Sequence, residues 1–186
     1  FPKGGDLLGE SKGDEPPADT KGYIILPPSI NRDNQATGEY SIAIGNGNLV
    51  SNGGMAFGVY NDASNTYATS IGFGNNASGR YTLAGGFAND AAGDYSVALG
   101  TYTTALAANS FVIGKYNYSS TGYNSTSWIE TDPLFIIGNG VNSSTVSDAM
   151  RVLKNGNTEI MTREAYAGLE IYHTSPTTSS SSFGLI

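Results

Sequence analysis

The sequence predicts an all-β fold in which short strands stack as the coils of a parallel β-roll, a form of β-solenoid. Glycine makes up 25 of the 186 residues, about twice the usual share of about 7%, and it lacks the every-third-residue period of collagen. A short apolar element that ends in glycine occurs six times, at intervals of 13 or 14 residues. Such an interval is too short for a helical hairpin, but it holds two short strands joined by two tight turns.

The repeat keeps its register in three columns. The closing glycines are spaced 13, 14, 14, 14 and 14 residues apart and are Gly45, Gly58, Gly72, Gly86, Gly100 and Gly114. Tyrosine recurs five residues before the glycine, at Tyr40, Tyr67, Tyr81 and Tyr95. A small apolar residue recurs five residues after it, at Val50, Ala63, Ala77, Ala91 and Ala105. Because the columns share one period, we expect the coils to stack in register, about 4.8 Å apart, into a rod.

Each copy has the pattern of a strand with two unequal faces. The residues one and three before the glycine are mostly large and apolar, and the residue between them is mostly alanine, which is the alternation of a strand. Either the large side chains fill the roll and the small ones face a neighbouring chain, or the arrangement is reversed. A 14-residue coil encloses little apolar area in both cases, so we expect chains to associate.

Asparagine and aspartate mark the expected bends. Three and four residues after the glycine, the middle coils contain Asn61-Asp62, Asn75-Asn76 and Asn89-Asp90. These residue types tolerate left-handed backbone and form turns in which the side chain bonds the backbone. The aligned oxygen atoms of Asp62, Asn76 and Asp90 could instead bind Ca²⁺. The turn interpretation is favoured, and we expect no metal site.

Two further columns predict contacts between neighbouring coils. Arg80 and Asp94 share one column, which predicts a surface ion pair that contributes about 0 to 1 kcal/mol. Tyr67, Tyr81 and Tyr95 share another column. Their rings could form a flat binding surface, but stacking that stabilises neighbouring coils is the favoured interpretation.

The copies resemble the head repeats of trimeric autotransporter adhesins of the YadA type. The resemblance is strongest in Gly93-Asp94-Tyr95-Ser96-Val97-Ala98-Leu99-Gly100, followed by Ala105. It covers about residues 38–114 and resumes at Leu134-Phe135-Ile136-Ile137-Gly138-Asn139-Gly140, which is similar to a further coil. The resemblance implies a left-handed parallel β-roll, assembled as a homotrimer that binds host matrix or cell surfaces. Similar repeats also occur in phage fibres and in other bacterial surface fibres.

We divide the chain into three parts. Residues 1–37, with five prolines, are expected to form an extended N-terminal arm or a cap of the roll, with one short strand near Tyr23-Ile24-Ile25-Leu26. Residues 38–140 form the β-roll, with an insertion at about 115–133. Residues 141–186 contain a hairpin that turns at Asn155-Gly156, a short helix at about 162–170 and a Ser/Thr-rich tract from Ser175 to Ser182.

The insertion contains the candidate ligand-binding residues. The 14-residue period is interrupted between Gly114 and Leu134, and this stretch holds Tyr116, Tyr118, Tyr123 and Trp128, the only tryptophan. Loops on a rigid scaffold are common binding sites, and these rings supply large amphipathic contact area or stack on sugars. Alternatively, the same rings cap the roll or fill the trimer axis.

The composition disfavours most enzyme and nucleic-acid functions. The chain lacks cysteine, and its sole histidine, His173, lies in the tail without a nucleophile motif. It contains neither a phosphate-binding glycine loop nor a His-Glu-x-x-His zinc motif, so we expect no catalytic residue and no cofactor. A net charge of −7 without a basic cluster excludes the usual nucleic-acid footprint. No run approaches 18 apolar residues, so we expect no membrane span in this sequence.

The expected function is that of a non-enzymatic, extracellular fibre module. Its partners would be two further copies of itself and a glycan or protein on the surface of a host or prey cell. One alternative is a structural subunit or spacer of an extracellular filament, and another is a receptor-binding segment of a phage fibre on a virion. A glycan-cleaving enzyme would need two carboxylates about 5 to 9.5 Å apart in a cleft, and the repeat supplies no such cleft.

Overall fold

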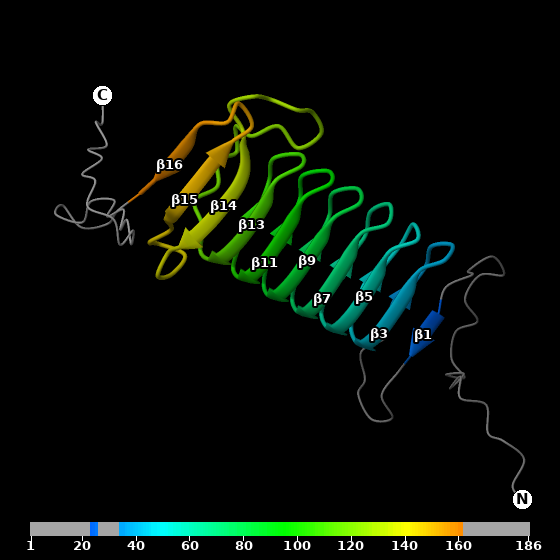
Figure 1. The fold of residues 1–186 in the computed structure, drawn as a ribbon. Coiled ribbons are helices and arrows are strands. Elements are labelled where there is room, and N and C mark those ends of the chain that lie inside the picture. Colours follow the sequence, from blue (N-terminus) through cyan, green and yellow to red (C-terminus); the bar gives the residue numbers. More distant parts are fainter. Residues whose placement is uncertain (1–22, 26–33, 162–186) are drawn as a thin grey trace, which may run out of the picture.

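The computed structural model describes residues 23–25 and 34–161, and these residues form one elongated stack of strands (Figure 1). Within these ranges the structure consists of strands, turns and loops and contains no helix. A ten-stranded sheet has the order β1-β3-β5-β7-β9-β11-β13-β14-β15-β16, and a six-stranded sheet has the order β12-β10-β8-β6-β4-β2. The all-β solenoid predicted from the repeat is confirmed.

From β3 to β12, each coil contributes one five-residue strand to the larger sheet and one two-residue strand to the smaller sheet. The larger sheet contains β1 (Tyr23–Ile25), β3 (Ile42–Asn46), β5 (Met55–Val59), β7 (Thr69–Phe73), β9 (Leu83–Phe87), β11 (Val97–Thr101), β13 (Phe111–Lys115), β14 (Pro133–Asn139), β15 (Asp148–Leu153) and β16 (Thr158–Ile160). The smaller sheet contains β2 (Gln35–Ala36), β4 (Leu49–Val50), β6 (Asp62–Ala63), β8 (Asn76–Ala77), β10 (Asp90–Ala91) and β12 (Thr104–Ala105).

Strand pairing follows the columns of the repeat. From β1 to β14 the neighbouring strands of the larger sheet pair in parallel, and Gly58 pairs with Gly72 while Gly100 pairs with Gly114. After the insertion, β14 pairs with β13 in the same register and places Gly138 opposite Gly114. The segment from Leu134 therefore adds the predicted strand in register with the repeat, but it does not complete a coil, because the smaller sheet ends at β12 and β14 pairs next with the antiparallel strand β15.

The small face of each strand lies inside the roll, and the large face points outward. The alanines between the large residues have no exposed surface, and neither does the small column of the second sheet: Ala43, Ala56, Ala84, Ala98, Val50, Ala63, Ala77, Ala91 and Ala105. By contrast, Met55, Ile71 and Phe111 are 38%, 44% and 40% exposed. The side chains buried between the two sheets are mostly alanine, with valine or isoleucine only at Val50, Val112 and Ile136. This observation decides between the two arrangements that the pattern left open.

A column of buried asparagines runs along the inside of the roll, beside the alanines. Asn48, Asn61, Asn75 and Asn89 are buried, and each side-chain oxygen accepts hydrogen bonds from the residue of this column in the next coil. Asn75, for example, accepts bonds from the backbone N and the Nδ2 of Asn89, both at 3.0 Å. Its own Nδ2 donates to Asn61 and to the carbonyls of Ile71 and Gly86. The column therefore supplies hydrogen-bond partners for buried backbone and side-chain amides that are not paired between strands.

Among described residues other than glycine, left-handed backbone occurs mainly at tyrosines rather than at the predicted Asn-Asp bends. Tyr60, which precedes Asn61, has a φ of 56°, and Gly74, which precedes Asn75, has a φ of 64°. A second set five residues before the closing glycine includes Tyr67, Tyr81 and Tyr95, with φ between 50° and 59°. The asparagines are instead drawn inside by their hydrogen bonds, and the residues that follow them form the short strands.

The closing glycines are required by both conformation and space. Their φ values range from 101° at Gly114 to 133° at Gly100, a region that residues with a side chain rarely adopt. A Cβ atom at Gly86 would lie 2.2 Å from the carbonyl oxygen of Gly100 in the next coil. The structural role predicted for this column is thereby explained by close approach of stacked backbones.

The parts that flank the repeat join the same stack. Two strands of the predicted N-terminal arm pair with the roll, because β1 pairs with β3 and β2 pairs with β4. At the other end, β15 and β16 form the predicted antiparallel hairpin, and Gly156 at its turn has a φ of 89°. The helix expected at 162–170, the tract Ser175 to Ser182 and His173 lie outside the described residues.

Candidate binding surface at the end of the roll

The insertion folds back onto the last coils of the roll. Since β13 ends at Lys115 and β14 begins at Pro133, the insertion comprises residues 116–132, a loop beside the hairpin (Figure 1). The backbone N of Asp94 donates to the carbonyl of Ser125 at 2.7 Å, and that of Ala108 donates to the carbonyl of Asn124 at 2.9 Å. The loop is thus paired to two coils that precede it by many residues.

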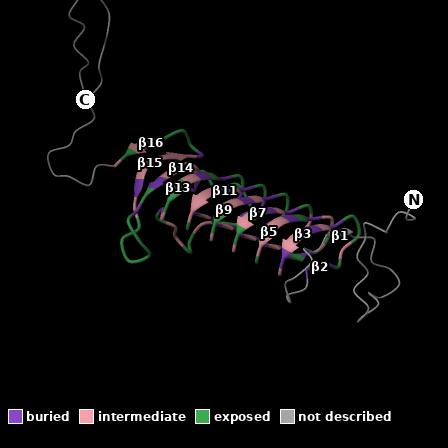
Figure 2. Ribbon diagram, turned by 90° about the horizontal axis from the view of Figure 1, so that it is seen from below, coloured by how far each residue is buried: buried purple, intermediate pink, exposed green. Residues whose placement is uncertain are grey.

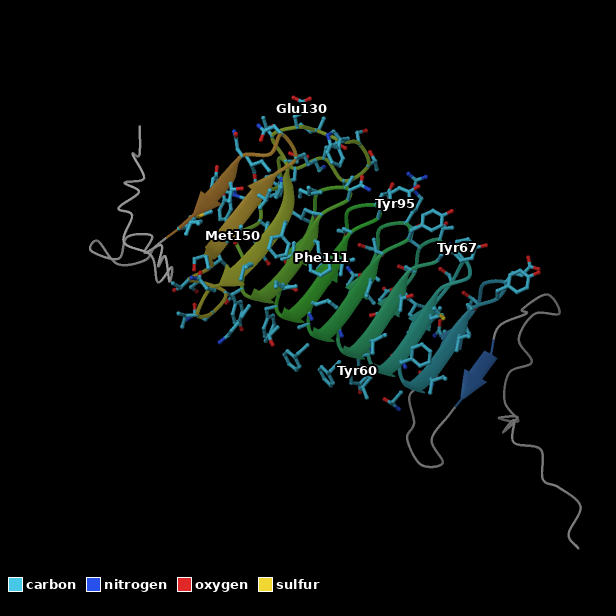
Figure 3. All side chains as sticks on the ribbon, viewed as in Figure 1. Tyr60, Tyr67, Tyr95, Phe111, Glu130 and Met150 are labelled. Atoms are coloured by element: carbon cyan, nitrogen blue, oxygen red, sulfur yellow. The ribbon has the colours of Figure 1, made fainter. Side chains whose placement is uncertain are left out.

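The hairpin holds the other side of the insertion. The backbone N of Lys154 donates to the carbonyl of Asp132 at 3.0 Å, and that of Asn155 donates to the carbonyl of Glu130 at 2.9 Å. Within the loop, the side chain of Asp132 accepts a bond from the backbone N of Asn124 at 2.9 Å. Hydrogen bonds on both sides hold the loop as a platform at the end of the roll, where Glu130 is labelled in Figure 3.

Trp128 presents an exposed ring that covers a buried cation. The residue is 53% exposed, and the Nζ of Lys154 lies 5.1 Å from its ring centroid, within the range of a cation–π interaction. This Nζ atom is buried and has no hydrogen-bond partner. Desolvation lowers the pKa of Lys154. The outer side of the indole therefore offers an aromatic surface with a positive charge beneath it.

Tyr123 anchors the insertion instead of projecting from it. Its hydroxyl accepts a hydrogen bond from Arg151 at 3.0 Å, and Arg151 also donates to Glu159 at 2.9 Å. Burial raises the pKa of Tyr123. The residue links the insertion to both strands of the hairpin.

Tyr118 lies between the insertion and the start of β15. Its side chain is 47% exposed, while its backbone N donates to Asp148 at 2.8 Å. The second carboxylate oxygen of Asp148 is buried without a hydrogen-bond partner, and desolvation raises the pKa of this residue. Tyr118 and Trp128 are therefore the two candidate rings of the insertion whose side chains remain largely accessible.

Tyr116 belongs to a different part of the surface. Its ring stacks on Tyr102, with centroids 4.7 Å apart and planes inclined by 8°. Of the four candidate residues, Tyr118, Tyr123 and Trp128 lie in the loop that the hairpin holds, whereas Tyr116 continues a row of rings along the roll.

Two rows of aromatic rings run along the roll. The first ring row contains Tyr67, Tyr81 and Tyr95, stacked with centroid separations of 5.6 and 5.2 Å. The second ring row contains Tyr60, Phe73, Phe87, Tyr102 and Tyr116, with separations from 4.7 to 5.8 Å. Figure 3 shows Tyr67 and Tyr95 along one edge of the roll and Tyr60 along the opposite edge. Stacking in the first row is as predicted.

The second row was not predicted, because its rings occupy two positions of the repeat. Phe73 and Phe87 directly follow the closing glycine, whereas Tyr60, Tyr102 and Tyr116 follow it by two residues. Rings at the same position stack, with planes inclined by 7° or 8°. Where the position changes, from Tyr60 to Phe73 and from Phe87 to Tyr102, the contact is edge to face. A scan for aromatic residues at either of the two positions would have found the row.

The predicted ion pair is present and is more buried than expected. Arg80 bonds Asp94 through its backbone N and its Nε, both at 2.9 Å, and through a guanidinium nitrogen. The Arg80 side chain is half exposed, but that of Asp94 is only 6% exposed. Hydrogen bonds from Arg80 lower the pKa of Asp94.

The column considered for calcium is held by hydrogen bonds between coils. Asp62, Asn76 and Asp90 each begin one of the two-residue strands β6, β8 and β10. Asn76 donates to Asp90 at 3.1 Å. In the described part of the chain, no group of three or more His, Cys, Asp or Glu side chains is arranged to hold a metal ion.

Comparison with protein families gives one match. Residues 32–48, 63–88 and 91–117 match the YadA head domain repeat, in two copies. The coils within these ranges are similar to YadA-type head repeats. Heads of the YadA type are trimeric and belong to a family of surface-exposed, adhesin-type structural modules. No curated protein and no solved structure matches the chain. Among the described residues, none lies in a helix that is long and apolar enough to span a membrane.

Proposed function

We propose that this chain forms one third of a homotrimeric, non-enzymatic head that attaches its parent fibre to a cell, matrix or glycan surface outside the cell. The observation that carries the proposal is the large apolar face of the ten-stranded sheet, which the single chain leaves partly exposed. Figure 2 shows intermediate exposure along its strands. On a chain built of YadA-type repeats, this face is the surface that two further copies would cover.

The outward face is apolar along most of the roll. One column of outward residues contains Ile42, Met55, Thr69, Leu83, Val97, Phe111 and Phe135. Soluble monomers rarely expose contiguous apolar patches of more than a few hundred Å². Since the core of one roll consists almost entirely of alanine, burial of this face between three chains would supply apolar contact that the interior lacks.

The attachment surface in this proposal is the platform of the insertion, with Trp128 and Tyr118 as the contact residues. Both rings are exposed on a loop that is held at both sides, so ordering them costs little entropy on binding. Three platforms on one trimer would add avidity to weak individual contacts. The partner class is a glycan or protein of a host or prey cell surface.

The test is binding of the purified protein to glycan and matrix-protein arrays, compared with Trp128→Ala. We expect Trp128→Ala to lose about five- to 150-fold in affinity for whatever ligand the unaltered protein binds, since removal of an aromatic contact residue costs on the order of 1 to 3 kcal/mol. Tyr40→Ala is the matched control, because Tyr40 is 67% exposed but lies in the first full coil, at the other end of the roll. Equal binding by Trp128→Ala and the unaltered protein would contradict the assignment.

A further inference from the structure

The two ring rows lie at opposite edges of one sheet face. Tyr67, Tyr81 and Tyr95 stand two residues before the starts of β7, β9 and β11. The second row stands at or just beyond the ends of the same strands, at Phe73, Phe87 and Tyr102. Because a five-residue strand spans about 17 Å, the two rows run in parallel along the roll and are separated by the width of the sheet (Figure 3).

Both rows are exposed in the single chain. The rings of the first row are 49% to 55% exposed, and Tyr60, Phe73, Phe87 and Tyr102 are 42% to 46% exposed. Stacking within a row covers the faces of the rings and leaves their outer edges uncovered. In the first row, the backbone that places the rings is left-handed at every tyrosine, a conformation that costs residues with a side chain about 1 to 2 kcal/mol. The rings are thus held at the edge of the sheet at an energetic cost.

Three-fold symmetry determines which edges meet. In a cyclic trimer each interface is heterologous, so one edge of a chain contacts the other edge of its neighbour. When the symmetry axis runs parallel to the stack of coils, the apolar faces point inward and the starts of the strands in one chain adjoin the ends of the strands in the next. This argument rests on the homotrimer of the proposed function.

Equivalent coils of the three chains would also lie at the same height along the symmetry axis. Rotation about such an axis keeps each coil beside the same coil of the next chain. The coils of β7, β9 and β11 carry a ring at both ends, which gives the facing pairs Tyr67 with Phe73, Tyr81 with Phe87, and Tyr95 with Tyr102. In the coil of β5 and in that of β13, the first-row position is instead Gly53 or Asn109.

We propose that the first ring row of each chain packs against the second ring row of its neighbour, so that an aromatic seam closes each of the three interfaces. The exposed ring edges of one row would approach the rings of the other in the edge-to-face or offset arrangement that aromatic pairs prefer, with centroids about 4.5 to 7 Å apart. The occupant of both rows is therefore a second copy of this chain rather than a glycan.

Chemical cross-linking tests the seam directly, because the chain has no cysteine. Tyr81→Cys and Phe87→Cys are made singly and together, and the proteins are treated with a short bismaleimide. A disulfide needs Cβ atoms about 4 Å apart, and two facing aromatic side chains hold their Cβ atoms further apart than this. The bismaleimide therefore spans the space that the two removed rings occupied. We expect the double variant to give covalent trimers on a denaturing gel, and we expect each single variant to remain a single chain.

The controls separate the seam from the trimer itself. Leu49→Cys/Thr104→Cys places two thiols on the smaller sheet, away from the proposed seam, and it should give no covalent trimer. Cross-linked dimers of either single variant would overturn the proposal, since they require like rows to meet. If the double variant shows no product while light scattering gives the mass of a trimer, the seam is wrong and the proposed homotrimer stands. A single-chain mass by light scattering would refute both.

Discussion

At the residue scale, hydrogen bonds of the buried asparagines stabilise the interior of the roll, where a typical globular domain has a larger hydrophobic core. The interior of the roll is lined by alanine, which contributes little apolar area. Each asparagine of the column bonds the coil before it and the coil after it, so the amides connect successive coils along the roll. The aligned Asn-Asp pairs were visible in the sequence, but their inward direction was not, because asparagine is equally common in exposed turns.

Replacement of Asn75 by alanine should destabilise the roll by about 2 to 4 kcal/mol. The change leaves the backbone N of Asn89 without its acceptor, which costs about 1 to 3 kcal/mol, and it removes the hydrogen bonds that the Nδ2 of Asn75 donates, which contribute about 1 kcal/mol more. Urea denaturation followed by circular dichroism measures the free energy of unfolding. Asn76→Ala is the control, since Asn76 is only partly buried and bonds one side chain; comparable losses for the two variants would contradict the role of the column.

The stabilising effect of Arg80 should depend on pH. Hydrogen bonds from Arg80 lower the pKa of Asp94 in the folded state, so the contribution is present above the ordinary aspartate pKa of about 3.9 and is lost as the pH falls through the lowered value. We expect the free energy of unfolding of Arg80→Ala to lie below that of the unaltered protein at pH 7 and to converge with it in acid. A difference that stays constant from pH 7 to pH 2 would rule out the ion pair as its cause.

At the element scale, the closing glycines set the distance between coils. Gly86→Ala should cost about 3 kcal/mol or more, because the new Cβ would lie 2.2 Å from a backbone oxygen of the next coil, in addition to the strain of a positive φ. Gly74→Ala is the matched control: its φ is also positive, but no atom lies within 4 Å of the added Cβ, so we expect only about 1 to 2 kcal/mol. Thermal unfolding distinguishes the two, and equal losses would show that space between coils is not the limiting factor.

The strands of the roll could be predicted from sequence because three columns shared one period. The direction of their faces could not, because both faces are apolar and either of them could line the interior of the roll. The insertion was located by the break in period, and its aromatic residues were identified. That Tyr123 anchors the loop while Trp128 is exposed depends on Arg151 and Lys154 in the hairpin, which lie some 25 residues further along the chain and carry no sequence pattern that links them to the loop.

At the scale of the whole molecule, the part of the chain that the structure describes combines a core of small side chains with exposed large apolar side chains. Its interior consists largely of alanine, while large apolar side chains line the outside of the ten-stranded sheet. Both features have one explanation if three rolls share a common apolar interior. The ring rows then close the interfaces, and the insertion, held at the end of the roll, remains free to contact a surface.

The mass of the protein in solution tests this account most directly. Light scattering on a size-exclusion column should give three times the 19.3 kDa mass of one chain, unchanged on dilution through the micromolar range, because the apolar face is buried only in the trimer. A mass of a single chain, with the β-rich circular dichroism spectrum of a folded roll, would contradict the trimeric head.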